Sequence, residues 1–547
     1  MIHHIEIQVL VLLLIASVVG MVARRLKLPY TLALVVAGLL LGFVHLEALH
    51  GVELNADLLL LLFLPPLLFE ATLHINLREF RTDFPGVITL AGPGVVLAVG
   101  LTSVLVYGGL SLTGLAPGFG WEHALLFAAV ISATDPVSVL ALFKELGVGR
   151  RLYMLVEGES LLNDGVAVVI FLIICAVLGI SGDYTPTGAS EIASYGMKTF
   201  VWMAGAGVGI GLMVGTAASV ISRQIDDHLI EVTLTTLVAY GSFLLAEELH
   251  ASGVLSTVAA GMTVGSVGRS YGMSASTRVA VEDFWEYMAF LANSFIFLLV
   301  GLQLEPALLL KSAPAIVVAF LCIVFVRGLV VYSLVPLTNR FIQNIPLSWR
   351  HVMAWGGLRG SLSMVLILTI PTDFPGRSTL VVIVFGVVAC SLFIQGLTIG
   401  KLVERLGLLS GNQDERNAFE LARGEALSAR HALHELHQLK AEGIITGKAG
   451  ARLEAWYQAR RERADAAVTD HSGEHMQDEQ MVEGMLRLMD AEREGLREAA
   501  RTGAISGKAA AQLTHNLNHR AAEVADMTHH SEEERRKHLK EMFGGED

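Results

Sequence analysis

VEGESLLNDGVAVVI, residues 156–170, places two glutamates, an asparagine and an aspartate inside a run that is otherwise apolar out to Leu178. A charged side chain near the middle of a bilayer costs roughly 2.5–3.5 kcal/mol even on the gentlest scale, so such residues usually face a cavity or a partner charge. On a helix, Ser160 and Asp164 fall on one face, and so do Glu159 and Asn163. The pattern predicts Asp164 as the carboxylate that binds an ion.

The composition of the chain predicts an all-α membrane protein. Its 547 residues are 53% hydrophobic and 17% charged, and the mean hydropathy is +0.57. Apolar runs long enough to span a bilayer recur from Ile7 to about Val403 and then stop. We therefore predict a transmembrane domain over 1–405 and a cytoplasmic helical tail over 406–547. The net charge of −13 argues against a nucleic-acid partner, and the three cysteines suggest no disulfide framework.

The apolar runs predict about thirteen transmembrane helices. They cover 7–23, 29–47, 55–73, 84–110, 121–143, 152–178, 196–220, 229–249, 253–268, 281–301, 309–335, 347–370 and 379–403. Lys and Arg concentrate in the odd-numbered connections, whereas the connections at 48–54, 111–120 and 250–252 contain neither. The positive-inside rule then predicts a multi-pass protein of the cell membrane, with the N-terminus outside and the tail in the cytoplasm.

Two charged residues are predicted at a common depth. At 1.5 Å per residue, Glu159 of span 6 lies about 10 Å from the cytoplasmic end and Arg327 of span 11 about 12 Å. An ion pair between them is the economical way for both to tolerate that depth. Arg359 is an alternative partner for Glu159.

Spans 5 and 12 look interrupted. Span 5 contains Thr134-Asp135-Pro136, where the proline removes a helix hydrogen bond. Span 12 contains Gly356-Gly357-Leu358-Arg359-Gly360, which is equally poor for a continuous helix. Interrupted segments at corresponding places in two inverted halves point to a transporter's binding site. We expect halves of spans 1–6 and 8–13.

The residues near these breaks suit a small monovalent cation. A buried carboxylate is disfavoured in its charged form, so Asp164 can hold either a proton or one cation. Thr134, Ser160 and Asn163 add neutral oxygens, which are hard ligands of the kind that Na⁺ or Li⁺ prefers. Asp135 and Arg359 can neutralise the dipoles of the broken helices, and Asp135 is also a candidate cation ligand.

Taken together, these motifs resemble the monovalent cation/proton antiporter family of NhaP-type and eukaryotic sodium/proton exchangers. The resemblance covers about 7–405. It implies an elevator-type homodimer, formed through membrane helices, in which spans 5 and 12 cross in a mobile core domain. It assigns ion binding to Asp164, lines the site with Thr134 and Asp135, and pairs Glu159 with Arg327.

The resemblance implies two further roles. It suggests a span 3 acid at a cytoplasmic funnel, here Glu70 after Pro65-Pro66. Electrogenic relatives carry a second aspartate at the position of Asn163, so asparagine implies one-for-one, electroneutral exchange. Glu157 also lies near the funnel, where solvated capping of the helix competes with ion binding as an explanation.

The tail repeats itself. Residues 443–449 (GIITGKA) match 503–509 (GAISGKA), and each copy reads helix, glycine-containing turn, helix. We predict two helical hairpins, at about 425–465 and 485–525. His434 and His437 have helical spacing for a metal, but solvated helix surface explains them as well. The tail is open to a regulatory partner or to self-interaction.

The sequence thus predicts an electroneutral Na⁺(Li⁺)/H⁺ antiporter that needs no cofactor and is not an enzyme, since no nucleophile–base pair, metal box or nucleotide motif occurs. Two alternatives stay open. A K⁺/H⁺ antiporter would use the same residues. A non-transporting membrane sensor that signals through its tail would need no competition between ions.

Overall fold

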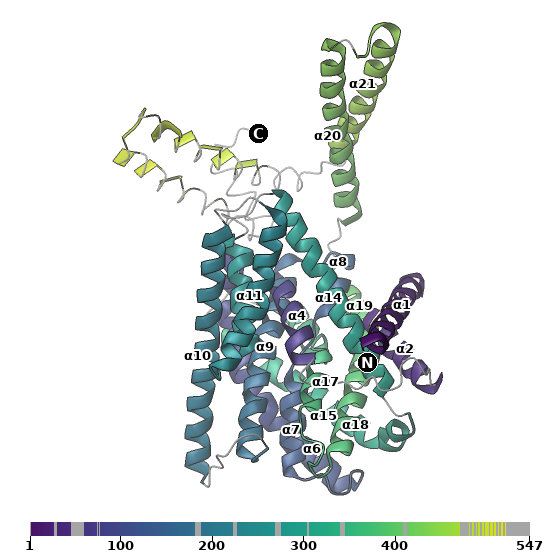
Figure 1. Cartoon of the computed structure of the whole chain (residues 1–547), viewed down its shortest axis with the longest axis vertical. Helices are drawn as coiled ribbons and strands as arrows, with labels where there is room; N and C mark the ends of the chain where they lie inside the picture. Colours follow the sequence, from purple (N-terminus) through teal and green to yellow (C-terminus); the bar gives the residue numbers. More distant parts are fainter. Residues whose placement is uncertain are drawn as a thin grey trace. The chain divides into compact units, whose positions relative to one another are not determined.

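The computed structural model describes residues 2–26, 30–44, 59–73, 75, 77–180, 188–222, 227–268, 275–303, 306–339, 345–408, 413–442 and 444–470, with parts of 481–524. Within these ranges the fold is helical (Figure 1). It forms two compact units, Met1–Ser410 and Gly411–Asp547. The helices of the first unit are α1 Ile2–Leu26, α2 Tyr30–Val44, α4 Leu64–Leu73, α5 Leu77–Thr89, α6 Val95–Thr113, α7 Trp121–Ser132, α8 Val137–Leu146, α9 Arg150–Val177, α10 Ala189–Ser222, α11 His228–Glu248, α12 Gly253–Thr263, α14 Ala275–Gln303, α15 Pro306–Thr338, α16 Leu347–Trp355, α17 Ser361–Leu368, α18 Arg377–Cys390 and α19 Gly396–Arg405.

The first unit is that of a multi-pass membrane protein. Among the described residues, nine helical stretches are long and apolar enough to cross a bilayer, and three more apolar helices are shorter. The predicted number of about thirteen spans, their inverted repeat, the orientation and the domain boundary after 405 stay predictions. Lys27 and the connection 48–54, which carry part of the charge argument, lie outside the described residues.

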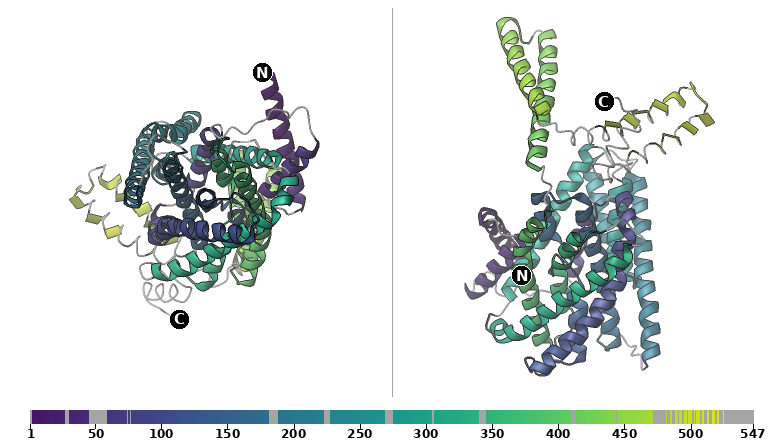
Figure 2. Two further views of the ribbon diagram at one scale, coloured as in Figure 1. Left: turned by 90° about the horizontal axis from the view of Figure 1, so that it is seen from below. Right: turned by 180° about the vertical axis from the view of Figure 1, so that it is seen from behind.

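The helices of the first unit form one bundle (Figures 1 and 2), and their contacts divide them into two groups. One, which we call the core group, contains α5–α9 and α15–α19. The other, the flanking group, contains α1, α2, α4, α10–α12 and α14. Within each group the helices pack extensively on one another. Fewer pairs join the groups: α9 packs on α10, α12 and α4, and α14 packs on α17.

Both predicted interruptions are present in the core group. The helix α7 ends at Ser132 and α8 begins after Pro136, because proline cannot supply the next helix hydrogen bond. The helices α16 and α17 are separated by residues 356–360. The two breaks meet, since the backbone N–H of Asp135 donates to the carbonyl of Leu358 at 2.8 Å.

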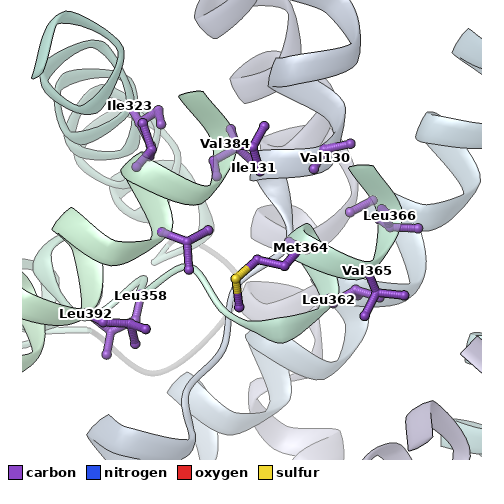
Figure 3. Packing of buried hydrophobic residues seen from close by; sticks show 14 of the residues in the cluster. Val130, Ile131, Ile323, Leu358, Leu362, Met364, Val365, Leu366, Val384 and Leu392 are labelled. Carbon is purple, nitrogen blue, oxygen red and sulfur yellow. The ribbon is translucent and has the colours of Figure 1, made fainter. Parts of the chain in front are cut away.

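Apolar side chains hold the crossing in place. Leu358 and Leu392 lie together at the second break, and Met364 of α17 belongs to the same apolar cluster as Val130 and Ile131 of α7 (Figure 3). Leu358 is fully buried. Burial of this kind stabilises by about 1.5–3 kcal/mol per large side chain where the alternative is water. The breaks are therefore rigidly packed.

Glycines let the backbones of the flanking group touch. Gly207, Gly211 and Gly215 recur every fourth residue on α10, and a Cβ added to them would lie 2.1–2.8 Å from backbone oxygens of α12 and of Ser252, its N-cap. On α2, a Cβ on Gly38 would lie 2.2 Å from the carbonyl oxygen of Leu298 on α14. Small residues at such spacing allow close helix approach in membranes. In this group, α10 with α12 and α2 with α14 therefore contact each other through their backbones.

Within the described residues, four short π-helical segments occur that were not predicted from the sequence: 59–63, 90–94, 264–268 and 391–395. In the second of these, Pro93 lies inside the segment. A proline lacks the N–H that an α-helix needs at that place, and a wider turn accommodates the loss.

The second unit contains a hairpin of α20 Gln413–Ala441 and α21 Gly447–Asp470. Ala429 and Ala464 are buried in it, and their counterparts 60 residues later, Met489 and Val524, are buried as well. The predicted ranges 425–465 and 485–525 stay predictions, because much of the second lies outside the described residues. His437 lies 3.5 Å from Glu454, and no cluster of three or more His, Cys, Asp or Glu able to hold a metal occurs in the described part of the chain.

Candidate ion-binding site

A cavity of about 270 Å³ lies between the core and flanking groups. The core group contributes Thr134 and Asp135 from the first break and Ser160 and Asp164 from α9, and the flanking group contributes Asn293 from α14. The predicted carboxylate is therefore accessible from a cavity and is not sealed among hydrocarbon side chains.

Asp164 is bound to the broken backbone of span 5. One of its carboxylate oxygens accepts a hydrogen bond from the backbone N–H of Thr134 at 3.1 Å. The Thr134 hydroxyl donates to the Ser160 oxygen at 3.2 Å, and the Ser160 hydroxyl donates to the Thr134 carbonyl. The interruption exposes backbone groups that a continuous helix would have used, and α9 supplies their partners.

Asn163 points elsewhere. Its amide donates to the Ser132 carbonyl at 3.0 Å and to the Thr134 hydroxyl at 2.9 Å. It lines a separate cavity of about 20 Å³ that also borders Arg327 and Arg359, and it is not among the residues that line the large cavity. The structure thus places Asn163 behind the site, where it holds the end of α7.

The ends of the broken helices meet opposite charges. Arg359 donates to the carbonyls of Ser132 and Ala133, at 3.0 and 3.3 Å, where α7 ends. Asp135 accepts from the backbone N–H of Val137 at 3.0 Å, where α8 begins. A cation at a helix C-terminus and an anion at an N-terminus are each stabilising.

Glu159 and Arg327 form a two-pronged ion pair inside the core group. The two terminal nitrogens of Arg327 donate to the two carboxylate oxygens at 2.8 and 2.7 Å, and both side chains are buried. Arg327 also donates to the Met353 carbonyl at 3.0 Å, near the end of α16. The partner of Glu159 is therefore Arg327 and not the alternative, Arg359. Gly357 packs against the same guanidinium, because a Cβ there would lie 2.9 Å from its Nε.

The predicted funnel residues line the same cavity as Asp164. Glu70 lies on α4 and Glu157 on α9, and Lys144 and Tyr153 line the cavity beside them. Glu157 is only 4% exposed. It is therefore not a solvated helix cap.

Polar contacts that the sequence analysis missed support the second break. The backbone N–H of Arg359 donates to the Ser391 hydroxyl at 3.1 Å, and that hydroxyl donates to Gln395 at 2.7 Å. Gln395 in turn donates to the Trp355 carbonyl at 3.0 Å, the last residue of α16. Uncharged polar residues are common in transmembrane helices, so neither residue stood out.

A second missed pair lies at one end of the core group. Arg151 of α9 donates to both oxygens of Asp83 on α5, at 2.7–3.2 Å. Its guanidinium also lies 5.4 Å from the ring centre of Trp349 on α16. Asp83 directly precedes predicted span 4 and Arg151 directly precedes predicted span 6, so the two residues share a depth in the sequence as well.

Comparison with known proteins agrees with this geometry. The family model described as "Sodium/hydrogen exchanger, transmembrane" matches residues 11–405. The Na⁺/H⁺ antiporter ApNhaP of Aphanothece halophytica is 41% identical over 407 residues, which cover 73% of this chain and 74% of that protein. The Na⁺/H⁺ antiporter NhaS2 of Synechocystis is 33% identical over 525 residues, which cover 94% and 93%. The second similarity therefore includes the tail.

The fold also has a solved counterpart. The sodium proton antiporter MjNhaP1 of Methanocaldococcus jannaschii aligns with a TM-score of 0.59 at 19% identity, over 74% of this chain and 99% of that one. The resemblance drawn from the motifs is confirmed: the chain belongs to the sodium/hydrogen exchanger family.

Proposed function

We propose that this protein exchanges Na⁺, or Li⁺, for H⁺ one for one across a cell membrane, and that Asp164 is the carboxylate for which the two ions compete. The observation that carries the proposal is the position of Asp164 on the cavity wall beside Thr134 and Ser160. The names of the relatives ApNhaP and NhaS2, both Na⁺/H⁺ antiporters, support the choice of ions.

Competition at one carboxylate is sufficient for coupling. When Asp164 is ionised, it attracts a cation, to which Thr134 and Ser160 can offer neutral oxygens. When it is protonated, it has no charge with which to hold one. Exchange follows if the loaded site can face either side and the empty, charged site cannot, because an unpaired charge is costly in a medium of low dielectric. Asn163 leaves a single acidic group in the Asn-Asp pair, which supports electroneutral exchange.

An elevator-type movement suits the packing. The cavity lies between the two helix groups, so displacement of the core group against the flanking group would carry Asp164 with it. Across this boundary Gly165 of α9 packs against the side chain of Leu255 on α12, whereas Gly211 of α10 and Gly38 of α2, within the flanking group, pack on backbone. Side-chain contacts rearrange more easily than backbone contacts. We also propose that the flanking group forms the dimer interface. The N-terminus would lie on the outer side of the cell membrane.

The test is exchange by the purified protein in proteoliposomes that contain a pH-sensitive dye. Addition of Na⁺ or Li⁺ should drive proton movement without a change in membrane potential, and K⁺ should be less effective. Asp164→Asn should abolish exchange while the protein remains folded. Exchange in that variant, or cation flux without coupling to pH in the wild type, would refute the proposal. Preference for K⁺ would favour the K⁺/H⁺ alternative.

A further inference from the structure

Two buried polar side chains meet at the end of α7. The terminal nitrogen Nη1 of Arg359 and the amide nitrogen of Asn163 both donate to the carbonyl of Ser132, each at 3.0 Å. Asn163 is 2% exposed and Arg359 is 6% exposed. One comes from α9 and the other from the second break. The shared carbonyl therefore holds the two side chains next to each other.

Each of these side chains has a further polar atom that is unsatisfied. The Nε of Arg359 and the Oδ1 of Asn163 have no hydrogen-bond partner among the residues that the structure describes. The first atom only donates and the second only accepts. Reversing the amide would not change this, because the Ser132 carbonyl only accepts and must therefore face the amide nitrogen. A donor and an acceptor are thus left over together, and leaving them unsatisfied in the interior is costly.

Both side chains line the cavity of about 20 Å³ that is separate from the cavity of Asp164. A bound water needs roughly 10–15 Å³ and two to four polar partners. Thr102 of α6, which is 4% exposed, lines the same small cavity and supplies a third polar group. The small cavity therefore has the volume and the polar groups for one water molecule. Much of its remaining wall is apolar, with Leu90, Val95, Ile323, Val326 and Val330 among the residues that form it.

The charges around the small cavity disfavour an ion. Arg327 and Arg359 both line it, so a metal cation would be repelled. An anion would suit the guanidinium of Arg359, but it would also face the Oδ1 of Asn163, which is itself an acceptor. The charge of Arg327 is already matched by Glu159. A neutral molecule that both accepts and donates fits the two unsatisfied atoms, and a cavity of this volume restricts that molecule to water.

We propose that the small cavity is a binding site for one structural water molecule. The water accepts a hydrogen bond from the Nε of Arg359 and donates to the Oδ1 of Asn163 and to the hydroxyl oxygen of Thr102. Together with the Ser132 carbonyl, it closes a ring of hydrogen bonds that joins the end of α7 to α9 and to the second break. Thr102 connects this ring to α6. The inference goes beyond the proposed function, because it does not depend on which ion is transported.

The direct test is a map of the wild-type protein, from crystals or from electron microscopy, at a resolution that shows ordered water. The expected result is a peak within hydrogen-bonding distance of both the Nε of Arg359 and the Oδ1 of Asn163. Absence of that peak in a map that shows other buried waters would overturn the proposal. Crystals grown in bromide separate water from an anion, because an anomalous peak at the site would identify a halide and would also overturn it.

A second test removes one partner of the water with little change in side-chain size. In Thr102→Val the water loses a hydrogen bond, so the thermal unfolding midpoint should fall and the peak should weaken. In a dry cavity the same change would only remove a buried hydroxyl, and the midpoint would stay the same or rise. Thr263→Val is the matched control, since Thr263 is equally buried but donates within its own helix, and it should retain the peak. A Thr102→Val protein at least as stable as wild type would refute the proposal.

Discussion

The backbone N–H of Asp135 donates to the carbonyl of Leu358 at 2.8 Å, so the two interrupted spans are joined where each has lost its own helix hydrogen bonds. Neither break is a loose loop. Asp135 and Arg359 satisfy the adjoining helix ends, and Ser391 holds the second break from a neighbouring helix. The proposed ion site is thus attached to a crossing of two interrupted spans that are bonded to each other.

Gly360→Ala should disrupt this crossing. A Cβ at Gly360 would lie 2.1 Å from the Cβ of Asp135, an atom bonded to the backbone that cannot rotate away. Overpacking of this kind costs about 1–3 kcal/mol, and we expect exchange to be lost. Thermal unfolding and proteoliposome exchange measure the two effects. Gly100→Ala is the matched control, because a Cβ there meets nothing within 4 Å. A Gly360→Ala protein with wild-type stability and exchange would contradict the expectation.

Arg327→Ala should lower stability mainly because it leaves Glu159 buried without its partner. Removal of one member of a buried pair costs about 3–5 kcal/mol. The double variant Glu159→Leu/Arg327→Met should recover part of this loss, although the Met353 carbonyl would still lack its donor. Unfolding midpoints of the two variants in the same detergent make the comparison. Equal midpoints for Arg327→Ala and wild type would argue against a stabilising role of the pair.

Asn163→Asp should not convert the protein to electrogenic exchange. The Asn163 amide donates to the Ser132 carbonyl and the Thr134 hydroxyl, and an ionised carboxylate could not donate to that carbonyl. We expect a loss of about 1–3 kcal/mol in stability and no transported charge. Currents across a supported membrane after a Na⁺ step measure charge movement. Asn163→Gln serves as a control for side-chain size, and a Na⁺-driven current in Asn163→Asp would contradict this reading.

The tail hairpin should loosen in acid. A hydrogen bond from Lys440, and its charge, lower the pKa of Glu454 from its ordinary value of 4.5. A lowered pKa in the folded state means that the pair stabilises the hairpin above the unfolded pKa and ceases to do so as pH falls through the folded one. Hydrogen-exchange protection of α20 and α21 in the full chain, corrected for intrinsic rates, should therefore fall below about pH 4.5.

Lys440→Met should remove that pH dependence, whereas Lys448→Met, at an exposed position of the same hairpin, should leave it unchanged. A dependence that persisted in Lys440→Met would assign it to other acidic groups.

The sequence predicted those parts of the site where a residue type by itself carries a large free-energy penalty, either in a helix or in a bilayer. Pro136 removes a helix hydrogen bond and the paired glycines at 356–357 weaken a helix locally. Glu159 and Arg327 are costly within a bilayer unless each has a partner. Even the direction of Asn163 was readable, since it shares a helix face with Glu159 and not with Asp164. Whether Asn163 also contributes to ion binding stays a prediction.

The remaining features depend on which helices become neighbours. Gln395 reaches Trp355, 40 residues away in the chain, and Asp83 reaches Arg151, 68 residues away. No local pattern in either segment names its partner. The cavity is likewise a property of two helix groups and not of one motif, so the sequence could suggest that Glu70 belongs to a funnel but could not place it opposite Glu157.

The contact between α10 and α12 has a consequence for how lipids act on this protein. Because their backbones touch at Gly207, Gly211 and Gly215, α10 and α12 cannot move closer together. A thinner or thicker bilayer would therefore tilt α10 and α12 together as a rigid pair, and the helices packed beside them would shift relative to that pair. The rate of ion exchange should then depend on the acyl-chain length of the lipids, because the rigid α10–α12 pair transmits a change in bilayer thickness to its neighbours.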